Sequence, residues 1–176
     1  KKVNIINQKH PEKISLNLSG TPLIDSDAFA SYKKQGVFGP LYKQAIKLNK
    51  FGFCTLHIQD PLWLNLISSI RLKLEKYFDI KSLKAGNLKS SRIQDAWDKL
   101  KIDEIRKLAC HPEILASLRI LYGRNPFPFQ TLNFPNGTRQ HFHSDAVHFH
   151  CIPKGFMCGV WVAFEDIHPD SGPLIY

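Results

Sequence analysis

The sequence lacks the features that mark several classes of protein. Its four cysteines include no Cys-x-x-Cys pair and form no dense framework, so reduced thiols in a cytosolic protein are expected. No apolar run reaches transmembrane length, and the stretch Lys1–Lys13 is too polar for a secretory signal. Internal repeats and low-complexity tracts are missing too. These absences predict a cytoplasmic protein with no membrane association.

The charge of the chain gives little information about its partners. Lysine and arginine number 24 against 15 aspartates and glutamates, a formal net charge of +9, which favours an anionic partner. The lysines are nevertheless scattered from Lys1 to Lys154 without a polybasic block. We therefore expect no nucleic-acid partner, and the net charge is weak support for an anionic ligand. The sequence does not indicate the oligomeric state.

Length and patterning predict a single α+β domain. With 176 residues, of which 43% are hydrophobic, the chain can bury one sizeable core. Residues 1–25 are polar and predict an N-terminal arm, whereas residues 26–176 form the domain. Its first part, to about residue 124, is mainly helical, and short β-type runs begin at about residue 127.

The helical part carries start and stop residues at several points. Gly39-Pro40 opens a helix that closes near Gly52, and Phe53–Ile58 follows as a short predicted strand. Asp60-Pro61 starts a long amphipathic helix. The loop Lys81–Ser91 leads to a second helical region that breaks near His111-Pro112 and stops at Gly123. The predicted later strands are Phe127–Phe134, Thr138–Phe142, Val147–Ile152, Phe156–Phe164 and Leu174–Tyr176.

The strongest indication of chemistry is the run Gln140–His150, which holds four histidines and Asp145. His143 and Asp145 are separated by one residue, so on an extended strand they point to the same face. With a further histidine, such a pair makes the facial triad of non-haem iron(II) oxygenases. His141 has the same parity, but three near neighbours would crowd one metal, so it is left outside the ligand set.

Two other interpretations of this run stay open. Each histidine alone could be an exposed or hydrogen-bonded strand residue, although the grouping favours a metal. The segment His141–Asp145 also resembles the start of the zinc motif of metallo-β-lactamase-fold hydrolases, but Ala146 stands where that motif has a histidine. A zinc hydrolase is therefore the less favoured alternative.

Several further segments resemble the phytanoyl-CoA dioxygenase family, a branch of the 2-oxoglutarate-dependent oxygenases that includes ectoine hydroxylase. The similarity runs from about Phe51 to Tyr176. The segments that carry it are Lys50–Phe53, Arg92–Asp95, Gln130–Phe134, His143–Asp145, Gly159–Asp166 and Asp170–Leu174.

The resemblance implies a double-stranded β-helix, a cupin-like jelly roll with N-terminal helices. It implies that His143 and Asp145 bind Fe(II), with 2-oxoglutarate as cosubstrate and O2 as oxidant. The expected reaction hydroxylates an unactivated C–H bond of a small organic substrate and yields succinate and CO2. Because Asp145 is present, we expect hydroxylation rather than halogenation.

Further residues match family positions around the metal. Arg92, Gln130 and, more weakly, Asn133 match contacts to 2-oxoglutarate, and Trp161 would line the cosubstrate pocket. The residues expected to border the substrate mouth are His148, His150 and Lys154. The sequence does not indicate which substrate binds there.

The family's third metal ligand, a distal histidine, and its arginine for the far carboxylate lie downstream of the segment Gly172–Leu174. His168 lies in a loop and is a poor ligand candidate. We therefore expect the β-helix to be incomplete at its C-terminal end within these 176 residues. The alternative is a natural short form that binds a ligand or partner without turnover.

Overall fold

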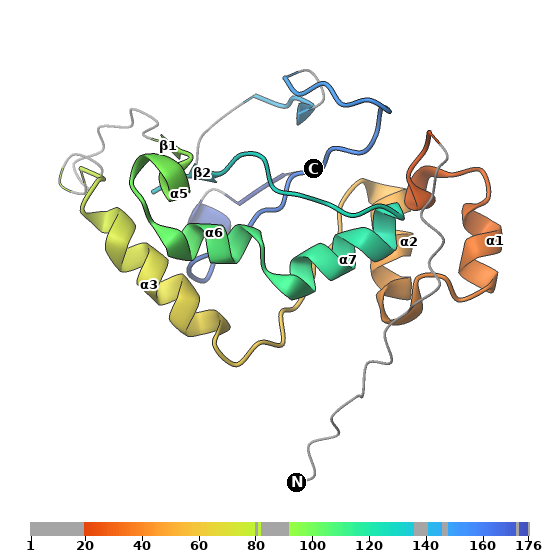
Figure 1. Cartoon of the computed structure of the whole chain (residues 1–176), viewed down its shortest axis with the longest axis horizontal. Coiled ribbons are helices and arrows are strands. Elements are labelled where there is room, and N and C mark those ends of the chain that lie inside the picture. Colours follow the sequence, from red (N-terminus) through yellow and green to blue (C-terminus); the bar gives the residue numbers. More distant parts are fainter. Residues whose placement is uncertain are drawn as a thin grey trace, which may run out of the picture.

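The computed structural model describes residues 20–79, 81, 92–135, 141–145, 148–171 and 173–175. Helices occupy the first part of the chain, and mostly irregular extended segments follow them (Figure 1). The elements, in order, are η1 Leu23–Asp25, α1 Phe29–Lys34, η2 Gly39–Leu41, α2 Tyr42–Phe51, α3 Trp63–Glu75, β1 Ile93–Gln94, α5 Ala96–Lys99, α6 Asp103–Ala109, α7 Pro112–Tyr122, β2 Leu132–Asn133 and η4 Pro169–Ser171.

The helix boundaries follow the start and stop residues of the sequence. Gly52 ends α2 in the left-handed conformation, with φ 77°, and its N–H donates to Leu48 O over 2.9 Å. Gly123 ends α7 in the same way, with φ 75°. Pro112 occupies the first position of α7, where no backbone N–H is needed. The predicted helices in these regions are confirmed.

Two hydrophobic clusters form the core. The first joins α3, α5 and α6 through buried residues such as Ile70 and Ile105. The second joins η1, α2 and α7 and includes Leu23, Phe38 and Leu121. Core packing thus begins before residue 26, inside the stretch expected to be a polar arm. No helix among the described residues is both long and apolar enough to span a membrane.

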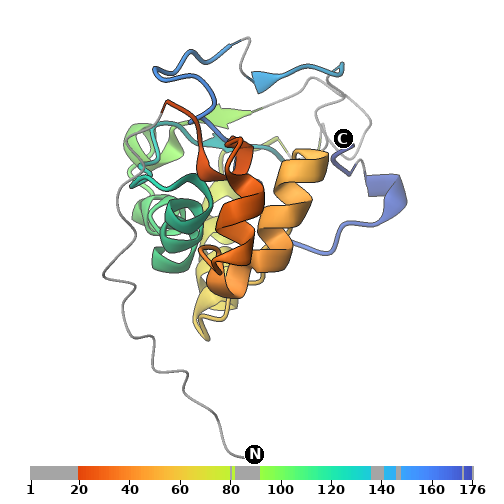
Figure 2. The same ribbon diagram turned by 90° about the vertical axis from the view of Figure 1, so that its right-hand side faces the viewer.

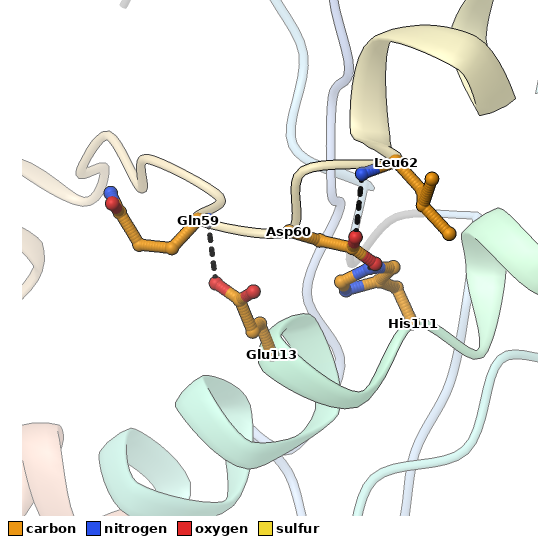
Figure 3. Close-up of polar contacts among 5 residues, drawn as sticks. All are labelled: Gln59, Asp60, Leu62, His111 and Glu113. Atoms are coloured by element: carbon orange, nitrogen blue, oxygen red, sulfur yellow. Dashed lines mark hydrogen bonds and ion pairs between the residues drawn. The ribbon is translucent and has the colours of Figure 1, made fainter. Parts of the chain in front are cut away.

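A polar junction joins the start of α3 to the start of α7 (Figure 3). Asp60 accepts the N–H of Leu62 at 2.8 Å through Oδ1, and its Oδ2 lies 3.0 Å from Nε2 of the buried His111. The hydrogen bonds from Leu62 and His111 lower the pKa of the Asp60 carboxyl. Glu113 in turn accepts the N–H of Gln59 at 2.8 Å. The break at His111-Pro112 is therefore a docking point between two helices.

The strand predictions are mostly wrong for the described residues. Strand β2 pairs antiparallel with β1, and these two short strands make the sheet. Residues 53–58, 148–152 and 156–164 contain no strand. A β-type run becomes a strand only where a neighbour accepts and donates its backbone hydrogen bonds. The double-stranded β-helix is thus not confirmed; residues 138–140, 147 and 176 of the predicted runs lie outside the described residues.

Candidate functional site

Residues 141–145, which include the predicted metal pair, belong to the light-blue segment above the helices in both views (Figures 1 and 2). The Nε2 atom of His143 lies 3.6 Å from Oδ1 of Asp145, and both side chains are accessible. Two donor atoms about 2.1 Å from one metal and at right angles are about 3 Å apart. The pair is therefore close to the separation that two neighbouring ligands require.

A hydrogen bond determines which nitrogen of His143 is available. Its Nδ1 lies 2.7 Å from the backbone oxygen of His141. Since a carbonyl only accepts, Nδ1 carries the proton, and the neutral ring keeps its lone pair on Nε2, the atom that faces Asp145. Such a carbonyl partner for the second ring nitrogen is typical of metal-ligating histidines.

The segment Gly159–Phe164 connects this pair to the helical core. A Cβ atom built on Gly159 would lie 3.4 Å from Oδ2 of Asp145, so the backbone passes close to the carboxylate. Further along, Val162 and Phe164 pack against the first hydrophobic cluster. Trp161 is exposed. In an extended chain successive side chains point to opposite sides, so Trp161 lies on the side opposite Val162 and on the same side as Gly159.

The three predicted substrate residues lie at the surface. The ring of His148 packs edge-on against His143, with centroids 5.8 Å apart. His150 and Lys154 are exposed. Phe149, next to His148 and His150 in sequence, packs edge-on against Phe129, with ring centroids 5.5 Å apart. The structure thus brings His148 to the metal pair and leaves His150 and Lys154 without a described contact to it.

The predicted cosubstrate residues lie on or beside the small sheet. Ile93 pairs with Asn133, and Gln94 pairs with Leu132. Because directly opposed residues share a face and neighbours alternate, Ile93 and Asn133 face the side of the first hydrophobic cluster. By the same alternation, Arg92 and Gln130 share the opposite face. Asn133 is therefore separated from the other two candidates.

Buried polar atoms on the core side of β2 were not anticipated from the sequence. Asn133 Oδ1 and Thr131 Oγ1 are buried and make no hydrogen bond within the structure. Asp95, also overlooked, accepts the N–H of Thr131 at 3.0 Å and donates its own N–H to Thr131 O at 2.8 Å. The position of Asp95 directly after Arg92-Ile-Gln was the one sequence feature that could have indicated it.

Within the described ranges, no group of three His, Cys, Asp or Glu side chains is arranged to hold a metal ion. His143 and Asp145 fit as two neighbouring ligands, so the donor set present agrees with an iron site in part.

Comparison with known proteins identifies a family for this chain. A family model described as Phytanoyl-CoA dioxygenase (PhyH) matches residues 75–176, from the end of α3 through the metal pair. No curated protein and no solved structure matches the chain, and the narrower likeness to ectoine hydroxylase is not confirmed. Family membership implies, in general terms, an oxygenase of the 2-oxoglutarate-dependent type. Because the match covers more than half of the 176 residues, the chain belongs to the phytanoyl-CoA dioxygenase family.

Proposed function

We propose that the protein is an Fe(II)- and 2-oxoglutarate-dependent dioxygenase that hydroxylates an unactivated C–H bond of a small organic substrate. The observation that carries the proposal is the His143–Asp145 pair, with its Nε2 to Oδ1 separation of 3.6 Å. Family membership over residues 75–176 supports the same reaction class.

His143 and Asp145 would hold the iron. The Nδ1 hydrogen bond to His141 O keeps the His143 ring oriented with Nε2 free to donate its lone pair. Asp145 adds a carboxylate next to it, which suits a divalent metal and occupies the position that a halide would need. When bound, iron with 2-oxoglutarate and O2 would supply the oxidative decarboxylation and the hydroxylation, with succinate and CO2 as products.

The outward face of the small sheet is the proposed side for 2-oxoglutarate. The Arg92 guanidinium can bind a carboxylate through two parallel hydrogen bonds, and the Gln130 amide can donate a further one. The indole of Trp161, on the side of Asp145, would cover the cosubstrate and exclude water. Asn133 remains a weaker contact because it faces the core side of the sheet.

The substrate would approach past the accessible edge of the histidine run. His148 lies against the His143 ring, which puts a second imidazole beside the metal pair. We propose that His148, with His150 and Lys154, favours a small anionic substrate. The proposed fold for residues 26–176 is that of a double-stranded β-helix with N-terminal helices.

The test is succinate formation by the full-length protein with Fe(II), 2-oxoglutarate and O2. Asp145→Ala removes a proposed ligand and is expected to lower the rate by at least about 1,000-fold, because the metal is no longer held. Asp166→Ala removes another exposed carboxylate and serves as the matched control; its rate should stay within about twofold of wild type. Equal rates in wild type and Asp145→Ala would overturn the proposal. Binding of 2-oxoglutarate without succinate would instead indicate a ligand-binding module.

A further inference from the structure

The sheet that carries Arg92 is too short to fix its own register. Strands β1 and β2 contain two residues each. A slip of one residue between paired strands would move every side chain to the opposite face. Arg92 and Gln130 share a face in the observed register, in which Ile93 lies opposite Asn133, and a slip of one residue would put them on opposite faces. Something beyond the two strands must therefore hold this alignment.

Asp95 is the residue placed to do so. It directly follows β1, and it exchanges two hydrogen bonds with Thr131, directly before β2. The backbone N–H of Asp95 donates to Thr131 O at 2.8 Å, and the backbone N–H of Thr131 donates to the Asp95 carboxylate at 3.0 Å. The second bond requires a side-chain acceptor at position 95, so it ties the register to the identity of this residue.

The backbone of Asp95 supports the same interpretation. Its φ is 53°, in the left-handed region, which residues other than glycine, asparagine and aspartate seldom adopt. This conformation turns the chain from β1 into α5 Ala96–Lys99, whose first residue, Ala96, is fully buried. Non-glycine residues held in this region cluster at functional sites, where the surrounding contacts keep them in place.

We propose that Asp95 is a positioning residue: its carboxylate fixes β1 on β2 in the register that keeps Arg92 and Gln130 together on the face that binds 2-oxoglutarate. This inference rests on the proposed function. Asp95 itself contacts no ligand in this account, since its carboxylate is engaged by the N–H of Thr131.

The test compares four full-length proteins: wild type, Asp95→Gly, Asp95→Asn and Lys101→Gly. Asp95→Gly permits the left-handed backbone but removes the acceptor. Asp95→Asn keeps an acceptor oxygen and tolerates the same backbone. Lys101 has φ 55°, so Lys101→Gly relieves a left-handed residue outside the sheet and is the matched control.

Two measurements are made on each protein. The first is hydrogen exchange of the Thr131 amide, which Asp95→Gly should accelerate by about tenfold while the other two variants leave it near the wild-type rate. The second is calorimetric titration of 2-oxoglutarate into the Fe(II)-loaded protein without oxygen. There Asp95→Gly should weaken binding about tenfold, or ~1.4 kcal/mol. It should raise KM for 2-oxoglutarate more than it lowers kcat.

The outcomes separate this inference from the proposed function. A wild-type protein that binds no 2-oxoglutarate overturns both. Normal binding by Asp95→Gly, equal weakening by Lys101→Gly, or unchanged exchange at Thr131 overturns only the role of Asp95. If Asp95→Gly does not fold, Asp95→Ser replaces it. The serine side chain is one bond shorter than that of aspartate, so its hydroxyl should not reach the N–H of Thr131, and we expect the same losses.

Discussion

The helical region and the extended region of the chain are built in opposite ways. The buried apolar residues of the described chain end at Leu121. After that point large apolar side chains are exposed, including Phe127, Phe142 and Ile152. The extended region nevertheless carries most of the candidate site. The comparison teaches that the helices supply the stable framework, and that the site residues depend on a few attachment points to it.

Three attachments can be named. Val162 and Phe164 pack on the first hydrophobic cluster, the Asp95–Thr131 pair joins β2 to the end of β1, and Arg71 on α3 lies 3.4 Å from Glu165. The last is an ion pair between exposed side chains, which contributes at most about 1 kcal/mol. Apolar packing and the backbone bonds therefore hold the site region in place.

The largest loss of stability is expected from a change in the core of the helical region. Ile70 is fully buried at the centre of the first cluster, and Ile70→Ala should lower the free energy of unfolding by about 2–5 kcal/mol, because the cavity cannot be refilled. Urea unfolding followed by circular dichroism measures the loss.

The matched variant in the extended region is Phe142→Ala. Phe142 is 83% exposed, so its removal should change the free energy of unfolding by no more than about 0.5 kcal/mol. A loss for Phe142→Ala as large as that for Ile70→Ala would show that the two regions do not differ in packing.

A smaller effect is expected at the junction of α3 and α7. The pKa of Asp60 is lower in the folded chain than its ordinary value of 3.8, so the folded state favours the carboxylate. The contribution of the Asp60 carboxylate to the free energy of unfolding is complete at pH values above 3.8. It is lost as the pH falls through the pKa of the folded state. Asp60→Asn should therefore be less stable than wild type at pH 7, and the difference should shrink below about pH 4.

Urea unfolding of both proteins across this pH range measures the difference. If the difference in the free energy of unfolding between wild type and Asp60→Asn widened as the pH falls, the hydrogen bonds of Asp60 would not be what stabilises the junction.

Much of the helical framework could be predicted from the sequence. Its helix boundaries depend on residues close in sequence. These are the left-handed glycines Gly52 and Gly123, the proline at the first position of α7 and the apolar periodicity of α3. The proximity of His143 and Asp145 could also be predicted, because residues two apart in sequence are near each other, although Asp145 begins a turn rather than continuing a strand. Family motifs then assigned the reaction class.

The rest could not be predicted because it depends on distant contacts. The β-type runs have strand composition, but strand formation needs a partner that composition does not reveal. The face of Asn133 follows from its pairing with Ile93, forty residues earlier in sequence. Similarly, Asp95 and His111 gain their roles from partners in other elements, Thr131 and Asp60.

The most direct test of the central claim is Fe(II) binding by the full-length protein without oxygen, measured by equilibrium dialysis with metal analysis. We expect wild type and His141→Ala to bind about one iron per chain, because His141 contributes its backbone oxygen and not its ring. His143→Ala should lose at least about 100-fold in affinity, since it removes a ligand. Equal binding by His143→Ala and wild type would contradict the assignment of His143 and Asp145 as the iron ligands.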